Sequence, residues 1–309
     1  MAVGARALSQ TGPPVRRARL RLSAAFWRWP WTKATGLLAP PLAAFLIVYV
    51  GALAALFISS FWGVDAFTGK IVHTWNLDNF RIVFSTSDPT YLRIAGRTIG
   101  IAAAVTLTDA IIAFPFAYFM ARIAPPQLRS VLFVLVLLPL WSSYLVRIYA
   151  WKTILAHDGA INWALNGIGL PDQNLAYTNW AMWIVFSYVW LPFMVLPIFA
   201  ALERIPDSYL EASADMGARG ARTFRSVVLP LALPGVIAGS IFTFSLTLGD
   251  YITPLLVGGT SSSFIGNVVY ENIGINANVP FSAAFATVPL IVMAVYLVIA
   301  RRLGAFAAL

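Results

Sequence analysis

The chain has 309 residues, of which 60% are hydrophobic and only 11% are charged. Soluble domains average roughly 45–50% apolar and about 25% charged residues, so an ordinary soluble domain is excluded. The absence of cysteine excludes disulfides, iron–sulfur clusters and thiolate zinc sites. The net charge of +9 would suggest nucleic-acid binding in a soluble protein, but in so apolar a chain it must first be compared with membrane topology.

The first 36 residues form a basic tail without any acidic residue. The apolar run that follows is too long for a secretory signal and is interpreted as an uncleaved first span. Six stretches are long enough to cross a hydrocarbon core of about 30 Å. They are Leu37–Trp62, Gly96–Met120, Val131–Trp151, Tyr177–Leu202, Val227–Val257 and Ala284–Ala300. We therefore predict an all-α, multi-pass fold with a tail at 1–36 and a transmembrane domain at 37–309.

The fifth stretch is too long for one straight helix and contains Pro230, Pro234 and Pro254. Proline lacks a backbone donor and kinks helices. We expect the prolines to divide this stretch into a cytoplasmic lead-in, a span and an external exit.

The basic residues fix the orientation. With a cytoplasmic N-terminus, 15 of the 21 Lys and Arg residues lie inside, as the positive-inside rule requires. Both termini are then cytoplasmic, and the charge is explained by orientation and contact with anionic membrane lipid rather than by nucleic acid. Outer segments 65–92, 156–174 and 258–281 are rich in Gly, Asn, Asp and Pro and are expected to be irregular or interfacial.

Residues 203–230, between the fourth and fifth spans, form the most polar inner loop. Asp207 or Ser208 can cap a short helix at Tyr209–Met216, because their side-chain oxygens accept from free N–H groups. Gly217 fits the left-handed position that ends such a helix. Tyr209, Ala212 and Met216 would share one face. Residues next to that face are Leu210, Ala214 and Gly217.

A motif with fixed spacing lies on this loop. Glu211, Ala212 and Ser213 are followed after three residues by Gly217, and after nine more by VVLP at 227–230. The pattern resembles the EAA signature of ABC importer permeases of the binding-protein-dependent type, which reads E-A-A, x3, G, x9, I-x-L-P. Ser213 and Val227 depart mildly from it.

The resemblance implies a type I importer permease in a bacterial cytoplasmic membrane, with residues 203–230 as its coupling loop. The residues expected to contact the ATPase are Tyr209, Leu210, Glu211, Ala212, Ser213, Ala214, Met216 and Gly217. The implied partners are a second, non-identical permease, two ABC ATPases and an extracytoplasmic solute-binding protein. ATP and Mg would be used by the ATPases. This chain would bind no cofactor and catalyse nothing, and it contains no phosphate-binding G-x-x-x-x-G-K-[ST] loop.

Further segments look like the permeases for spermidine and putrescine. They are PLWSSYLVRIYAWKTIL from Pro139, LPFMVLPIFAALERIP from Leu191, LGDYITPLLVGG from Leu248 and IGNVVY from Ile265. Together with the signature they cover most of the core at 91–302. Relatives of that subfamily carry other small organic solutes, so a different solute remains an alternative.

Two acidic residues lie inside predicted spans, Asp109 and Asp250. An ionisable group there costs about 3 kcal/mol on insertion scales and suggests function. We predict that both line the path of a cationic solute. The alternatives are an interhelical hydrogen bond for Asp109 and a helix-end role for Asp250, which follows Gly249.

Aromatic residues near these acids could hold an alkylammonium group by cation–π contact. The candidates are Trp141, Tyr144, Trp190 and Tyr251. Arg147 is interpreted as an outer residue whose charge reaches the membrane surface.

Two other classes of membrane protein fit the sequence less well. A secondary transporter or channel would have no ATPase to receive the coupling helix. An intramembrane aspartyl protease would need Gly and Tyr where Thr247 and Thr108 stand. No metal site is predicted, because neither His73 nor His157 has a neighbour at ligand spacing.

Overall fold

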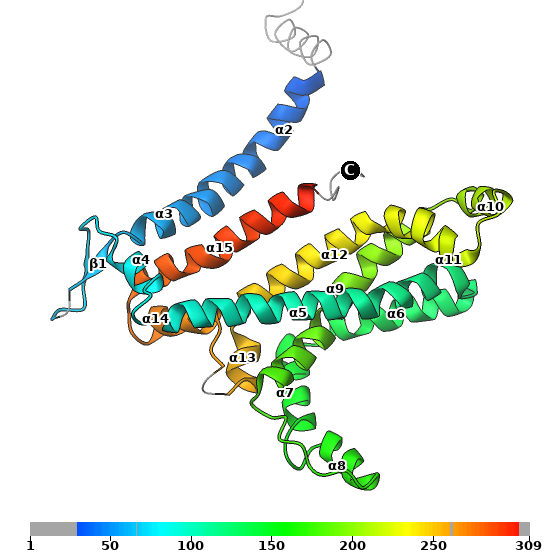
Figure 1. Ribbon diagram of the computed structural model, residues 1–309. Helices are drawn as coiled ribbons and strands as arrows, with labels where there is room; N and C mark the ends of the chain where they lie inside the picture. The colour runs from blue at the N-terminus through cyan, green and yellow to red at the C-terminus, as the bar shows by residue number, and fades with distance from the viewer. Residues whose placement is uncertain (1–29, 66, 260–261, 303–309) are drawn as a thin grey trace, which may run out of the picture. The chain divides into compact units, whose positions relative to one another are not determined.

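The computed structural model describes residues 30–65, 67–259 and 262–302 (Figure 1). Most of the predicted basic tail therefore lies outside the described residues. Within them, five helices are long and apolar enough to cross a membrane, and a bent helix pair supplies a sixth span. The spans are Thr35–Ser59, Thr90–Ile123, Pro126–Trp141 with Tyr144–Ile154, Asn179–Glu203, Gly220–Gly249 and Val279–Arg302. The predicted helical, six-span architecture is confirmed.

The chain divides into two compact units, the first of which ends at Ile58. The first span consists of α2 (Pro30–Ala44), the π-helical turn η1 (Phe45–Val50) and α3 (Gly51–Ser59). Its large apolar side chains from Leu37 to Ile58 are exposed, except for the half-buried Leu56. Exposure of this kind is expected of a helix that faces lipid.

The other spans belong to the second unit. They are α5 (Thr90–Tyr118) with the π-helical turn η2 (Phe119–Ile123), α6 (Pro126–Trp141), α7 (Tyr144–Ile154), α9 (Asn179–Glu203), α12 (Leu229–Gly249) and α15 (Val279–Arg302). Shorter helices are α4 (Asp78–Val83), α8 (Ala160–Gly167), α10 (Asp207–Asp215), α11 (Gly220–Thr223), η3 (Phe224–Val228), α13 (Ile252–Val257) and α14 (Ile265–Gly274). A two-stranded antiparallel hairpin joins β1 (Gly63–Val64) to β2 (Ile71–Val72). The outer segments expected to be irregular thus contain short regular elements.

The third span is not one straight helix, which corrects the expected Val131–Trp151. Its two helices, α6 and α7, meet at an angle of 94°. Ser142 and Ser143 between them are not helical, with ψ angles of 151° and 136°. The Pro139 carbonyl at the end of α6 accepts both the Ser142 N–H, at 3.2 Å, and the Ser142 hydroxyl, at 2.7 Å.

The fifth span also differs from the expectation, because Pro230 and Pro234 do not break it. The helical segment Gly220–Gly249 runs through both prolines. Pro230 is the second residue after the π turn η3, where the backbone hydrogen-bonding register changes, so a missing donor is tolerated there. The break falls instead at Asp250, before α13.

Helices α5, α9 and α12 pack side by side and form the core of the second unit (Figure 1). One buried cluster lies toward the inner loops and includes Ala113, Ala117, Met120, Met194, Ile198, Leu202 and Ala232. A second cluster lies toward the opposite ends and includes Val105, Ile148, Met182, Val185, Phe186, Val257 and Phe264.

Two glycines allow α12 to approach α9 closely. A Cβ built on Gly235 would lie 2.5 Å from the Ala201 Cβ and 2.6 Å from the Pro197 carbonyl oxygen. One built on Gly239 would lie 2.7 Å from the Met194 sulfur. This G-x-x-x-G pair is a typical device of membrane helix packing.

Changing Gly235 to alanine is therefore expected to destabilise the protein. Overpacking costs about 1–3 kcal/mol, more than the gain of about 1 kcal/mol that alanine offers in a helix. A Cβ at Gly100 of α5 would meet nothing within 4 Å, so Gly100→Ala is the matched control. The check is the thermal midpoint of the purified protein in detergent, which should fall by a few degrees for Gly235→Ala only. Equal midpoints for both variants would contradict close packing at Gly235.

Candidate functional site

The polar inner loop contains helix α10, which ends in a Schellman motif. Gly217 has φ +77°, a left-handed conformation. The Gly217 N–H donates to the Ala214 carbonyl at 2.8 Å, and the Ala218 N–H donates to the Ser213 carbonyl at 3.0 Å. These bonds satisfy carbonyls that a helix end otherwise leaves free. The predicted helix stop at Gly217 is thus seen in the structure.

The residues expected to contact an ATPase fall on two sides of α10. Tyr209, Ala212 and Met216 are exposed, and Met216 is 82% exposed. Glu211, Ala214 and Gly217 are exposed as well. Leu210 instead packs partly buried against the inner apolar cluster. Ser213 is buried, and its hydroxyl lies 2.9 Å from that of Thr223. Leu210 and Ser213 therefore hold α10 in place, and the other residues form its free surface.

The start of α10 corrects the expected cap. Neither Asp207 nor Ser208 is the N-cap, which is Pro206, and no side chain caps the helix there. Asp207 is the first helical residue, and its carboxylate binds Arg122 instead. The Asp207 carboxylate thus binds an arginine at the inner end of the second span rather than the free N–H groups of α10.

On the opposite side of the second unit, Asp250 lies where α12 breaks before α13. It is 8% exposed. Its Oδ1 accepts from the Ile252 N–H at 2.8 Å, and its Oδ2 accepts from the Thr253 hydroxyl at 2.7 Å. The Tyr144 hydroxyl of α7 donates to the same Oδ2. Asp250 thus stabilises the start of α13 and links it to α7.

The break in the fifth span therefore meets the bend in the third. Tyr144 begins α7 directly after that bend. Its ring stacks on Trp190 of α9, with ring centroids 5.6 Å apart. The Arg147 guanidinium also lies over the Tyr144 ring, 5.8 Å from the ring centroid. Three of the predicted pathway residues, Asp250, Tyr144 and Trp190, are thus brought together from three spans.

The remaining pathway candidates are placed elsewhere. The Tyr251 ring stacks on Tyr270 of α14 at 4.8 Å, and its carbonyl accepts from the Asn267 amide at 2.8 Å. Trp141 is 83% exposed at the end of α6. Within the described residues, neither side chain hydrogen-bonds to the Asp250 carboxylate.

Asp109 is fully buried in α5. Among the described residues, neither of its carboxylate oxygens has a partner at hydrogen-bonding geometry, although the Ser187 hydroxyl of α9 lies beside it. This carboxyl group is therefore not accessible to a solute in this conformation.

Sequence reasoning missed Arg122, which the structure places between the inner loops. It also missed Thr253, which shares the Asp250 carboxylate with Tyr144. No local pattern predicts Arg122, because its partners lie 80 or more residues away. Thr253 could have been found from the Asp-x-x-Thr spacing, which places it in the first turn of a helix after Asp250.

Six spans, a folded polar inner loop and a polar cluster between broken spans define a multi-pass α-helical membrane transport protein. Residues 92–306 match the family described as "Binding-protein-dependent transport system inner membrane component". The chain belongs to this family of ABC importer permeases. It is accordingly a multi-pass protein of the bacterial inner membrane.

Two relatives illustrate the similarity. The inner membrane ABC transporter permease protein YdcU of Escherichia coli is 45% identical, over 96% of this chain and 97% of its own length. The spermidine/putrescine transport system permease protein PotB of Escherichia coli is 33% identical, over 77% of this chain and 85% of its own length.

Solved structures share the fold. A bacterial ABC transporter involved in the import of the acidic polysaccharide alginate matches with a TM-score of 0.71 and 19% identity, over 91% of this chain and 99% of that one. The MetNI methionine ABC transporter in an inward-facing conformation matches with a TM-score of 0.52 and 19% identity, over 68% of this chain and 93% of that one. At this identity they show the type I permease fold alone.

Proposed function

We propose that this chain forms half of the translocation path of an ATP-driven importer. The observation that carries the proposal is α10, an ordered helix on the inner side whose Tyr209, Ala212 and Met216 face remains exposed. A second, non-identical permease supplies the other half of the path. Two ATPases inside and a solute-binding protein outside complete the proposed complex.

The proposed division of labour leaves ATP chemistry to the partners. ATP and Mg bind the ATPases, and closure of the ATPases draws the coupling helices together. That movement rocks the spans around a central cavity, so that access alternates between the two sides. This chain contributes the path and the coupling surface and catalyses no reaction.

The proposed solute is a polyamine. Its ammonium groups lose water on entering the membrane, and a carboxylate with aromatic faces can offset that cost. Asp250, Tyr144 and Trp190 offer this combination where two broken spans meet, as solute sites in transporters often do. The similarity to PotB supports the same solute class.

A second candidate is another small organic solute. Arg147 lies over the Tyr144 ring, and its Nε and Nη1 atoms are buried without hydrogen-bond partners among the described residues. A positive charge so close to Asp250 repels a polycation and favours a solute with a negative group.

The test is ATP hydrolysis by the complete importer in proteoliposomes, measured with a panel of amines, amino acids and oxyanions. We expect spermidine or putrescine, delivered by the binding protein, to stimulate hydrolysis. Stimulation by neutral or anionic solutes alone would contradict the polyamine assignment and leave the permease proposal intact. If the complete importer hydrolyses ATP but takes up no solute, the permease proposal itself is contradicted.

A further inference from the structure

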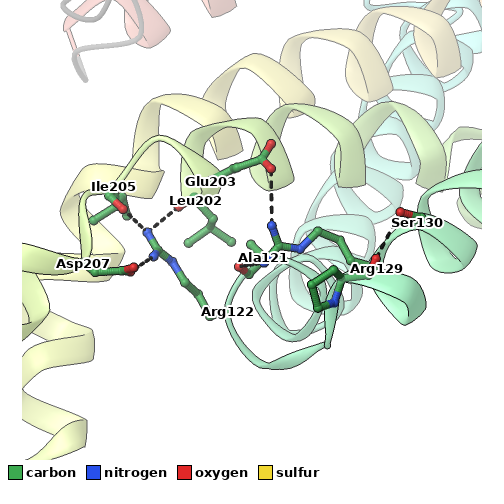
Figure 2. A network of polar contacts seen from close by, with 9 residues as sticks. Ala121, Arg122, Arg129, Ser130, Leu202, Glu203, Ile205 and Asp207 are labelled. Carbon is green, nitrogen blue, oxygen red and sulfur yellow. Dashed lines mark hydrogen bonds and ion pairs between the residues drawn. The ribbon is translucent and has the colours of Figure 1, made fainter.

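The inner loops are joined by two arginines (Figure 2). Arg122 lies on η2, at the inner end of the second span, and Arg129 lies near the start of α6. Arg122 points toward the end of α9 and the start of α10, and Arg129 points toward Glu203 at the end of α9. Their contacts are therefore placed where the coupling helix meets the spans.

Arg122 makes the larger set of contacts. Its Nη1 donates to the Asp207 carboxylate of α10 at 2.8 Å. Its Nη2 donates to the carbonyl oxygens of Leu202, at 2.6 Å, and of Ile205. The Leu202 carbonyl belongs to the last turn of α9 and the Ile205 carbonyl to the connection that follows, where a positive charge is stabilised by the helix dipole. One guanidinium group thus holds three segments at once.

The Arg122 side chain is only 12% exposed, whereas Asp207 is 82% exposed. The contacts of Arg122 with the Leu202 and Ile205 carbonyls are accordingly shielded from water, whereas its ion pair with Asp207 is exposed to water. Exposed ion pairs contribute little to stability, because water screens them. The carbonyl contacts therefore fix the guanidinium, and the fixed guanidinium positions Asp207.

Arg129 supports the same joint. Its Nη1 lies 3.5 Å from the Glu203 carboxylate at the end of α9, and its Nη2 donates to the Ala121 carbonyl at 3.1 Å. It connects α6 to α9, and among the described residues its polar contacts do not include α10. Arg122 is thus the residue of this pair that reaches the coupling helix.

A chain connection of three residues, 204–206, joins α9 to α10. Such a joint alone would let α10 pivot when an ATPase pulls on it. Leu210 and the Ser213–Thr223 contact hold the rest of the helix to the inner cluster and to α11. Arg122 adds a fixed connection from the first turn of α10 to the second span.

We propose that Arg122 is a positioning residue that makes the coupling helix move as one body with the inner ends of the second and fourth spans. This inference rests on the proposed function of α10. It assigns to the first inner loop a part in coupling that the signature motif does not contain. Loss of the guanidinium would let α10 follow the ATPase without moving the spans.

The experiment uses the complete importer in proteoliposomes and compares Arg122→Gln with wild type. Coupling energies of this kind correspond to roughly 5-fold or larger effects, so we expect the ratio of solute-stimulated to basal ATP hydrolysis to fall about 5-fold. Basal hydrolysis should persist. Arg122→Lys retains the positive charge but lacks the planar guanidinium that donates in several directions at once. It should give an intermediate ratio of stimulated to basal hydrolysis. Asp207→Asn should have a smaller effect than Arg122→Gln.

Arg81→Gln is the matched control, because it removes an exposed pair with Asp78 at 3.2 Å on an outer helix. It should leave the ratio unchanged. A ratio for Arg122→Gln equal to that of Arg81→Gln would overturn the proposal. If the wild-type complex itself shows no solute-stimulated hydrolysis, the proposed function fails, and this inference fails with it.

A distance measurement separates positioning from simple loss of stability. The chain contains no cysteine, so spin labels can be placed at Ile123→Cys and Asp215→Cys, both at exposed positions. Asp215 lies on α10 but outside the proposed ATPase surface, which includes Met216. We expect the separation of the two labels to stay constant when ATP binds in the wild-type background and to change in Arg122→Gln. An ATP-dependent change already present in the wild-type background would overturn the proposal, as would a constant separation in both backgrounds.

Discussion

Replacing Gly217 by leucine is expected to lower solute uptake roughly 5- to 30-fold, the factor that 1–2 kcal/mol represents. Gly217 has φ +77°, and a Cβ there would meet no atom within 4 Å. The cost is thus conformational rather than steric, about 1–2 kcal/mol for a left-handed L-residue. To relieve it, the chain must give up the Schellman bonds that end α10. The exposed surface next to Met216 would then be displaced from the ATPase.

Two substitutions separate this effect from side-chain size. Asparagine tolerates the left-handed conformation, so Gly217→Asn should keep most of the uptake. Gly220 is equally open but has no positive φ, so Gly220→Leu should behave like wild type. Uptake into proteoliposomes is measured at equal amounts of inserted protein. If Gly217→Leu and Glu211→Ala both transport normally, this loop is not the coupling element.

The end of α10 could be predicted because its cause is local. A glycine after a short run of helix-forming residues carries the Schellman motif within its own sequence. The start could not be predicted in the same way. Asp207 looks like a cap, yet its carboxylate binds Arg122, which lies 85 residues earlier in the chain. Spacing along one segment cannot reveal such a partner.

The broken spans show that proline alone does not predict where a membrane helix ends. Pro230 and Pro234 both lie in continuous helix, and for Pro230 the preceding π turn η3 provides an irregular position for the missing donor. The real break at Asp250 is stabilised by its side chain and by Tyr144, 106 residues away. The bend at Ser142 was marked in the sequence by Pro139 and two serines, which a hydropathy window does not register.

The sequence of α12 contains a local pattern that indicates close packing against another helix. Gly235 and Gly239 form a G-x-x-x-G pair in an apolar helix, which predicts a close helix contact. The pattern does not say which helix approaches. That α9 fills this role, through Pro197 and Met194, follows only from the fold.

The second large effect is expected for Asp250→Asn, which should lower polyamine uptake about 10-fold or more. A hydrogen bond to a charged group contributes about 1.5–3 kcal/mol, which corresponds to such a factor. Asparagine keeps the shape and one acceptor, so the Ile252 N–H can still be satisfied. The negative charge that would stabilise an ammonium group is lost. The measurement is spermidine uptake by the assembled complex, together with its thermal stability.

Asp250 could also act only by holding α7 to α13, and Tyr144→Phe distinguishes the two roles. Phenylalanine removes the hydroxyl that binds Asp250 but keeps the ring that stacks on Trp190. If the carboxylate binds solute, Asp250→Asn lowers uptake far more than Tyr144→Phe, and the two variants assemble equally well. If the carboxylate is a purely structural link, both variants lose thermal stability and uptake in parallel. Unchanged polyamine uptake in a stable Asp250→Asn complex would exclude direct contact with the solute.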